Sequence, residues 1–556
     1  MKSDLEIAQA ATLQPIVDIA TKINLDPDII EQYGRYKAKL PLSLIDEGKV
    51  QSSNLILVTA ITPTPAGEGK TTTSIGLTEG LNKIGKKAAV VLREPSLGPV
   101  FGIKGGAAGG GFSQVIPMED INLHFTGDFS AIEKANNLLS ALIDNNIQSK
   151  TRNLNIDPRT IMWKRVMDMN DRSLRQTVIG LGGTLNGIPR EDGFNITPAS
   201  EVMAILCMSK DLEDLKTRLG NIYIGSTFDK KPIYAKDLKA QGAMALLLKE
   251  AIKPNLVQTL EGNPAFIHGG PFANIAQGTN TIIATKMGLS LNDYVVTEAG
   301  FGADLGAEKF LNIKCVAAGL KPKAVVLVAT IRALRHHGGA KKAEYNDASI
   351  DRVKAGIVNL EKHIENCQKF GLNPVVAINH FPTDTAEEIE FVKSRCDELG
   401  VQSVLAKGFA EGGNGMTDLA KAVISSIESG KNNFKALYDW NLPIKEKINR
   451  IALEIYGADG VDYAKKADSE LKRIDALGLS GLPVCMAKTQ KSFSDDELLI
   501  GRPTGFRVTV REFEIAAGAG FIIPILGKMM RMPGLPEIPA SEGMDIDASG
   551  IITGLS

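Results

Sequence analysis

The residues best suited to chemistry form a glycine-rich turn that ends in a lysine and threonines: Thr64-Pro65-Ala66-Gly67-Glu68-Gly69-Lys70-Thr71. Glycines let backbone N–H groups approach phosphate oxygens, Lys70 can reach the outer phosphates, and Thr71 can ligate Mg²⁺. The pattern G-x-x-x-x-G-K-[ST] is not fully met, because its first position is Thr64. A plain glycine turn is the alternative, but the flanking apolar run and the tandem threonines favour phosphate binding.

The elements around this turn predict how it is positioned. An apolar run at 55–59 precedes it and a helical pattern through Leu77 and Leu81 follows it, which predicts a strand, a phosphate loop and a helix. A second run at 88–92 should form a parallel strand, so Arg93 leaves that strand at the edge that carries the loop. Further short apolar runs precede glycine, aromatic or charged residues: 265–267, 294–297, 324–329, 375–378 and 403–405. The sequence therefore predicts an α/β fold, a P-loop NTPase-like parallel sheet flanked by helices, with one long active-site edge.

Other segments carry weaker signals. Residues 1 to about 50, 150–260 and 444–471 are predicted to be mainly helical, and 521–526 a buried strand. Arg172, Arg175 and Arg190 are equally compatible with a pocket and with the surface. The stretch 98–112 is too glycine-rich for a helix or strand and is expected to be a loop that lines a site. Asp128 precedes a helical pattern, and either a capping or a functional role fits it.

Composition excludes several classes of protein. The 556 residues include 44% hydrophobic residues, enough for large cores, and Lys+Arg 63 against Asp+Glu 64 leaves no basic excess to attract nucleic acid or a membrane surface. The five cysteines are widely spaced and form no C-x-x-C pair, so free thiols are expected. The N-terminal residues do not resemble a signal peptide, and no apolar run approaches a membrane span. A soluble, cytoplasmic protein is expected, in which local basic pockets remain possible.

Three stretches together point to a family. Residues 102–112, 328–339 and 64–71 closely resemble formate–tetrahydrofolate ligase, also called formyltetrahydrofolate synthetase, and the similarity extends to the Pro-Gly-Leu-Pro segment at 533–536. The length fits the single-function bacterial form. The resemblance implies that ATP, formate and tetrahydrofolate give ADP, phosphate and 10-formyltetrahydrofolate through formyl phosphate. It also implies a homotetramer that uses Mg²⁺ and responds to a monovalent cation, K⁺ or NH₄⁺.

The resemblance also implies roles for individual residues. Thr64 to Thr71 would hold ATP, with Thr71 at the Mg²⁺; Lys70, Arg93 and Asp128 would be catalytic; and Phe301 and Phe381 would flank the pteridine. For two isolated phenylalanines, core packing is the alternative. Leu405 stands where many relatives have tryptophan, and the nucleotide base is placed near 406–413. Three domains are expected: 1–360 for nucleotide binding, 361–460 as a second α/β domain of the folate and nucleotide cleft, and 461–556 as a small C-terminal domain.

Two other classes share the loop. Regulatory ATPases of the partition or nitrogenase-iron-protein type have the same order of strand, glycine loop and Lys-Thr-Thr, but they commonly carry a second lysine where this chain has Pro65. A nucleotide sensor without turnover is the other alternative. It is weakened by the aromatic residues and arginines that follow other predicted strands.

Overall fold

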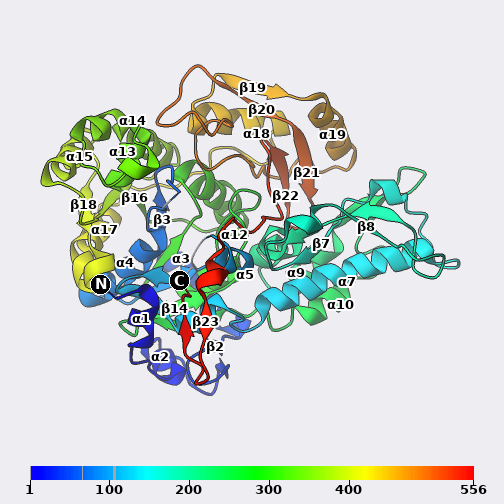
Figure 1. Cartoon of the computed structure of the whole chain (residues 1–556), viewed down its shortest axis with the longest axis horizontal. Coiled ribbons are helices and arrows are strands. Elements are labelled where there is room, and N and C mark those ends of the chain that lie inside the picture. The colour runs from blue at the N-terminus through cyan, green and yellow to red at the C-terminus, as the bar shows by residue number, and fades with distance from the viewer. Residues whose placement is uncertain (1, 66, 104–107, 556) are drawn as a thin grey trace.

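A large mixed sheet forms the centre of the molecule (Figure 1). The computed structural model describes residues 2–65, 67–103 and 108–555. Within them the sheet has twelve strands, and its central part is parallel in the order β14-β4-β15-β3-β16-β17-β18. These strands are β14 (Pro264–Ile267), β4 (Ala88–Leu92), β15 (Tyr294–Glu298), β3 (Asn54–Ala60), β16 (Ala324–Ala329), β17 (Val375–Asn379) and β18 (Ser403–Ala406). The strands predicted from the apolar runs are confirmed, and so is their common direction.

Helices cover both faces of this parallel sheet, which explains why its strands are apolar along their whole length. Leu55 and Leu57 of β3 enter one core, while Ile56 and Val58 enter another. The first core includes residues of α11 (Ile282–Leu291) and α13 (Ile331–His337), and the second includes residues of α4 (Lys70–Lys83) and α17 (Thr417–Glu428). The side helices α14 (Ile350–Lys369) and α15 (Ala386–Glu398) complete this part of the fold.

Antiparallel strands extend the sheet beyond β14, and they correct two predictions. The first fifty residues are not only helical: α1 (Asp4–Gln9), α2 (Ile16–Lys22) and α3 (Glu47–Ser52) are joined by β1 (Glu31–Gln32) and β2 (Ala38–Lys39), and β2 pairs with β13 (Asn255–Thr259). The glycine-rich stretch is not all loop, since it includes α5 (Leu97–Phe101) and β5 (Gly109–Gly110), which pairs with β6 (Ser113–Ile116). The backbone groups of an open sheet edge recruit such short strands despite poor local propensity.

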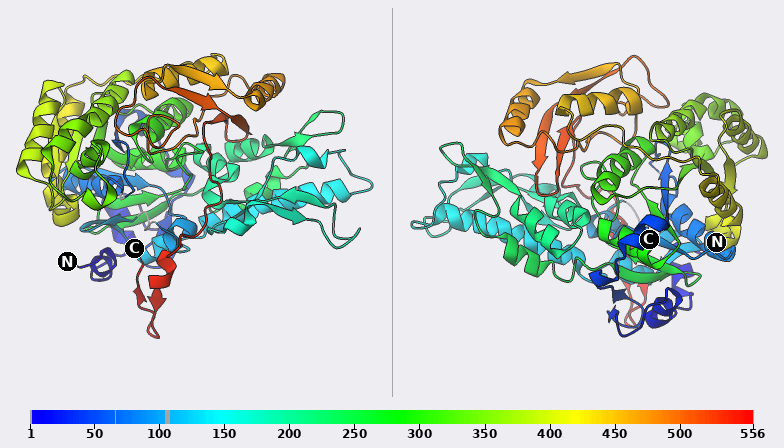
Figure 2. Two further views of the ribbon diagram at one scale, coloured as in Figure 1. Left: turned by 45° about the horizontal axis from the view of Figure 1, so that its top comes forward. Right: turned by 180° about the vertical axis from the view of Figure 1, so that it is seen from behind.

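An arm extends from the body beside the sheet (Figures 1 and 2). The long helix α7 (Asp128–Gln148) runs along it, together with α10 (Gln241–Leu247) and small two-stranded sheets. The prediction that 150–260 is mainly helical is wrong, because short strands share this region with α8 (Glu201–Met208) and α9 (Leu212–Gly220). The strands are β7 (Arg165–Met167), β8 (Thr177–Ile179), β9 (Arg190–Asp192), β10 (Phe194–Ile196), β11 (Tyr223–Ser226) and β12 (Pro232–Tyr234).

Residues 444–525 lie above the sheet and the arm in the view of Figure 1, whereas the last strands, after residue 544, lie at the bottom of that view. A single helical stretch over 444–471 is wrong, since α18 (Ile444–Arg450) and a π-helix end at Gly457, whose φ is 76°, before β19 (Gly460–Tyr463) and α19 (Lys465–Ala476). The buried strand is confirmed as β22 (Phe521–Ile525), which pairs with β21 (Glu512–Ala516). The remaining strands are β20 (Arg507–Val510), β23 (Asp545–Ile546) and β24 (Ile552–Thr553).

The predicted fold class is therefore confirmed: a mostly parallel α/β sheet flanked by helices, with several small additional sheets. The three domain boundaries stay predictions. In the described ranges, no helix combines the length and the apolar character needed to cross a membrane.

Candidate functional site

The glycine-rich turn connects the carboxyl end of β3 to the first turn of α4, as predicted. Gly67 and Gly69 both adopt positive φ, 76° and 73°. A side chain at Gly69 would collide with the amide of Asn379, so glycine is required there for space as well as for conformation. Lys70 is the first residue of α4. Ala66, one of the predicted ATP-binding residues, lies outside the described residues.

The buried side chain of Glu68 fixes the shape of this turn. One carboxylate oxygen accepts a hydrogen bond from the backbone N–H of Thr64 at 2.7 Å, and the other accepts one from the hydroxyl of Thr330. The side-chain amide of Asn379 donates to the backbone carbonyl of Glu68 at 3.1 Å. Residues after three neighbouring strands, β3, β16 and β17, thereby hold the turn in one conformation.

The carboxylate of Glu298, which the sequence alone did not single out, lies next to Thr71. The hydroxyl of Thr71 donates to Glu298 at 2.9 Å, and Glu298 is buried at the carboxyl end of β15, the strand next to β3. A threonine at the end of a phosphate loop and an acid on a nearby strand are the groups that hold Mg²⁺ in P-loop NTPases. The two oxygen ligands suit a hard cation.

Arg93 follows β4 at the same edge, as predicted. Its guanidinium donates to the carbonyl of Pro271 at 3.2 Å, and it lies against the backbone of Gly300, where a Cβ would be 3.2 Å from Nη1. Gly300 immediately precedes Phe301. The end of β15 thus brings the predicted transfer arginine and one predicted folate-binding ring together.

Phe301 has an unusual backbone conformation. Its φ is 60°, a region that non-glycine residues rarely adopt and that is found at functional sites more often than elsewhere. Its side chain is only partly buried. This favours a contact with a ligand over ordinary core packing.

Phe381, the second predicted folate-binding ring, lies two residues after β17 and is half-buried. The guanidinium of Arg332 stacks on it, with Cζ 3.7 Å from the ring centroid. The strands that carry the two phenylalanines, β15 and β17, are three spacings apart in the sheet, about 14 Å. A single pteridine ring could contact both phenylalanines only if both side chains pointed toward each other across this distance. Otherwise the two rings would contact different parts of the folate.

Asp128 does not cap its helix. The N-cap residue of α7 is Gly127, without a side-chain hydrogen bond, and the carboxylate of Asp128 instead pairs with Lys39 at 2.8 Å and accepts from the amide of Asn255 at 2.9 Å. The side chains of Lys39, Asp128 and Asn255 are all buried. The pKa of the neighbouring Glu94 is raised well above its ordinary value, by burial first and by the charge of Asp128 second.

The glycine-rich stretch and the segment after β18 lie together near α4. Residues 104–107 fall outside the described ranges, but the backbone N–H of Phe112 donates to the carbonyl of Phe409 at 2.9 Å. Leu405 lies within β18 and packs on the core, so it does not reach the edge. Phe409 and Phe112 are both partly exposed aromatic residues there. Inspection of the residues after each strand would have found Phe409 one position beyond Lys407-Gly408.

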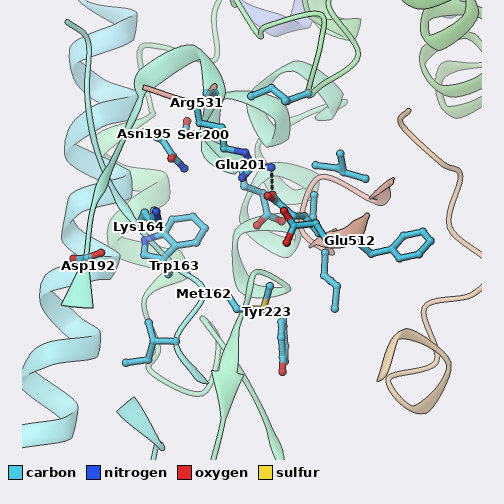
Figure 3. A pocket seen from close by; sticks show the side chains of 18 of the residues that line it. Met162, Trp163, Lys164, Asp192, Asn195, Ser200, Glu201, Tyr223, Glu512 and Arg531 are labelled. Carbon is cyan, nitrogen blue, oxygen red and sulfur yellow. Dashed lines mark ion pairs between the residues drawn. The ribbon is translucent and has the colours of Figure 1, made fainter. Parts of the chain in front are cut away.

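A cavity of about 770 Å³ lies elsewhere, between the arm and the C-terminal strands (Figure 3). Its lining includes Trp163, Lys164, Glu201, Glu512 and Arg531. Of the three arginines that the sequence left undecided between a pocket and the surface, Arg190 lines this cavity and pairs with Asp144 at 3.0 Å. Arg172 and Arg175 donate to backbone carbonyls of the C-terminal segment. None of the predicted catalytic or binding residues lines it.

Comparisons with known proteins identify the family of the chain. A solved structure of a mutant of L. casei FPGS is 9% identical over 85% of each chain, with a TM-score of 0.19, too low to carry an argument. The family model for formate–tetrahydrofolate ligase matches residues 2–556. The chain is therefore a member of the formate–tetrahydrofolate ligase family, enzymes that ligate formate to tetrahydrofolate at the expense of ATP.

Proposed function

We propose that this enzyme activates formate as formyl phosphate at the carboxyl edge of the sheet and then transfers the formyl group to tetrahydrofolate. The observation that carries the proposal is the end of β15. There Glu298 accepts a hydrogen bond from the loop residue Thr71, and Gly300 packs against Arg93. Phe301 follows directly. Groups suited to a nucleotide, to a transferred phosphoryl group and to a flat ring thus meet at the end of one strand.

The chemistry accounts for this arrangement. A formate oxygen attacks the γ-phosphorus of ATP and ADP leaves, giving a mixed anhydride whose carbonyl carbon is open to the folate amine. When the amine attacks, phosphate leaves with the bridging oxygen. Two anions must meet in the first step, so positioning and charge neutralisation supply most of the catalysis. Lys70 would bind the outer phosphates and Arg93 the transferred phosphoryl group, as a flat donor of paired hydrogen bonds.

Mg²⁺ fits this site, since Thr71 and Glu298 offer oxygen ligands beside the loop. When bound, the ion would neutralise charge on the nucleotide phosphates. A monovalent cation, K⁺ or NH₄⁺, belongs to the same proposal on the ground of family membership, as do a homotetrameric assembly and a cytoplasmic location.

Phe301, Phe381 and Phe409 are proposed to contact the folate, with Asp128 near the reacting groups. Stacking and apolar burial suit a pteridine, and all three rings lie after strands of the same edge. The ion pair with Lys39 would hold the carboxylate of Asp128 in place. The nucleotide base is proposed to lie beside the same segment, residues 406–413, which also carries Phe409.

An isotope-labelling experiment tests whether formyl phosphate is the intermediate. Formate labelled with ¹⁸O at both oxygens is supplied under single-turnover conditions, and the released phosphate is analysed by the isotope shift in ³¹P NMR. One labelled oxygen per phosphate is expected, because the bridging oxygen of formyl phosphate comes from formate. Unlabelled phosphate would mean that ATP is hydrolysed by water and would reject the intermediate.

A further inference from the structure

A second guanidinium at the catalytic edge has no role in the proposed mechanism. Arg332 is the second residue of α13 and follows β16, which pairs with β3 on the side away from β15. Its position is fixed by its neighbours. Thr330, two residues before it, donates to the carboxylate of Glu68 in the glycine-rich turn, and Asn379, two residues before Phe381, donates to the backbone of the same glutamate. The stacked pair of Arg332 and Phe381 therefore stands beside the turn.

Within the part of the chain that the structure describes, residues 2–65, 67–103 and 108–555, the guanidinium of Arg332 has no hydrogen-bond acceptor. The Nε of Arg332 is buried and has no partner among these residues. Stacking on Phe381 holds the guanidinium flat and leaves its N–H groups directed outward from the edge of the plane. A buried donor of a charged group without an acceptor is costly.

Arg335, one turn further along α13, shows what a structural arginine looks like in the same helix. It is fully buried, its guanidinium forms paired hydrogen bonds with Glu388, and it also donates to the carbonyls of Tyr345 and Thr383. Each of its three nitrogens has an acceptor. The contrast within one turn of helix indicates that the free donors of Arg332 serve something other than the fold.

We propose that Arg332, held by Phe381, is a binding site for an oxyanion of a substrate. The choice of ligand rests on the proposed function, which supplies two sources of the same chemistry. One is the phosphate chain of the nucleotide on the adjacent turn, and the other is a carboxylate of the glutamate tail of the folate. Both present planar or tripodal oxygens to which a guanidinium can donate two hydrogen bonds.

Binding measurements on the full chain separate these sources. Isothermal titration calorimetry is performed with Mg²⁺ and a non-hydrolysable ATP analogue, with tetrahydrofolate carrying one glutamate, and with tetrahydrofolate carrying three. Arg332→Gln is expected to weaken binding of either the nucleotide or the folates by roughly 10- to 100-fold, the range for hydrogen bonds to a charged group. Loss confined to the nucleotide identifies a phosphate; loss confined to the folates identifies a tail carboxylate.

Matched variants keep the test decisive. Lys342→Gln removes a positive charge from the exposed segment after α13 and should leave all three affinities within twofold. Arg332→Lys keeps the charge without the flat fork, so an intermediate loss is expected. Thermal melting should be almost unchanged in Arg332→Gln, since no described residue accepts from its guanidinium. Unchanged affinity for all three ligands, or equal weakening of all three, would overturn the proposal. Turnover is not measured, so the result is independent of the isotope experiment.

Discussion

Two regions of this molecule contain arginines near a potential binding site, and they use them differently. In the cavity between the arm and the C-terminal strands, each lining arginine is ion-paired: Arg159 with Asp157, Arg190 with Asp144, and Arg531 with Glu514. At the carboxyl edge of the parallel sheet, the proposed catalytic site, Arg93 donates to one carbonyl and Arg332 stacks on an aromatic ring. Neither has a carboxylate partner in the described part of the chain.

If the proposed function is correct, the difference separates charges that hold the protein together from charges that would bind a substrate. A guanidinium removed from water is tolerated when a carboxylate compensates its charge, as Asp144 of the arm does for Arg190 and Glu514 of β21 does for Arg531. At the edge the compensation would come from phosphate or carboxylate groups of ligands. On this proposal, the pairing of charges is a better guide to the active site than the volume of a cavity.

The most severe test of the edge is Lys70→Ala. Loss of the lysine that reaches the nucleotide phosphates should remove formate- and tetrahydrofolate-dependent ADP release, by roughly 10³-fold or more, while the helix start tolerates alanine well. Release of ADP is measured by a coupled assay, with circular dichroism to confirm folding. Lys83→Ala, at the far end of the same helix, is the control. Near-normal release from Lys70→Ala would exclude the turn from catalysis.

Arg93→Leu is expected to have the next largest effect. Turnover should fall by roughly 10²–10³, the scale for losing one preorganised donor to developing charge, while affinity for the ATP analogue stays close to that of the native enzyme. Steady-state kinetics and calorimetry give the two quantities. A defect in nucleotide affinity alone would place Arg93 outside the transfer step.

Phe301→Ala should act on the folate. The KM for tetrahydrofolate is expected to rise by roughly 10- to 100-fold, with smaller changes for ATP and formate, because the ring supplies stacking and apolar burial. Phe301→Gly removes the same ring but relieves the positive φ of 60°. Both variants should raise KM alike if the ring is responsible. Equal rises for all three substrates would indicate damage to the edge instead. Phe381→Ala should show the same selectivity for folate.

Arg190→Gln tests the other half of the comparison. Breaking a partly buried pair with Asp144 should lower the free energy of unfolding by roughly 1–2 kcal/mol, and thus the Tm of this 556-residue chain by only about 1–2 °C, with turnover unchanged within twofold. Differential scanning calorimetry and the ADP assay are the measurements. A large loss of turnover at unaltered Tm would make the cavity part of the active site, and the two groups of arginines would then no longer differ in purpose.

Much of the edge could be predicted from the sequence, for a physical reason. Strands of a parallel sheet are buried on both faces, so runs such as 324–329 and 375–378 are recognisable from apolar character alone, and the residues after them must meet at one edge. This rule predicted that Arg93, Phe301 and Phe381 lie at the sheet edge that carries the glycine-rich turn, and all three follow strands at that edge. The sequence-based roles of these residues stay predictions.

Contacts across the sheet could not be predicted in this way. Glu298 becomes informative only through its hydrogen bond with Thr71, and Arg332 only because no described residue accepts from its guanidinium. The ion pair of Lys39 with Asp128 joins residues far apart in the chain, which local pattern cannot reveal. The arm was misjudged because strands of three residues, such as β7 and β8, are too short to show a period of two.

The smallest expected effect concerns His337, a buried neutral side chain next to the glycine-rich turn. His337 accepts a hydrogen bond from the backbone N–H of Gly501 at 3.2 Å through Nδ1, so its Nε2–H donates to the carbonyl of Thr62, at the start of the glycine-rich turn, at 2.9 Å. Burial lowers the pKa of His337 to about 3. The imidazole must stay neutral, since protonation would destroy the bond from Gly501.

The sign of the pH effect follows from this lowered pKa. Between an unfolded pKa near 6.5 and a folded pKa of about 3, the unfolded chain binds one more proton at this position, so stability is complete above pH 6.5 and falls as the pH is lowered, by up to about 1.4 kcal/mol per pH unit. His337→Gln keeps a donor for Thr62 and cannot titrate. Its Tm, measured by calorimetry from pH 7.5 to 5, should start lower because the bond from Gly501 is lost, but it should decline less steeply. The buried His268 and His363, whose pKa values are also lowered by burial, will retain part of the slope. A decline parallel to that of the native enzyme would show that His337 is protonated without cost, and its contact with Thr62 would then be irrelevant to the stability of the edge.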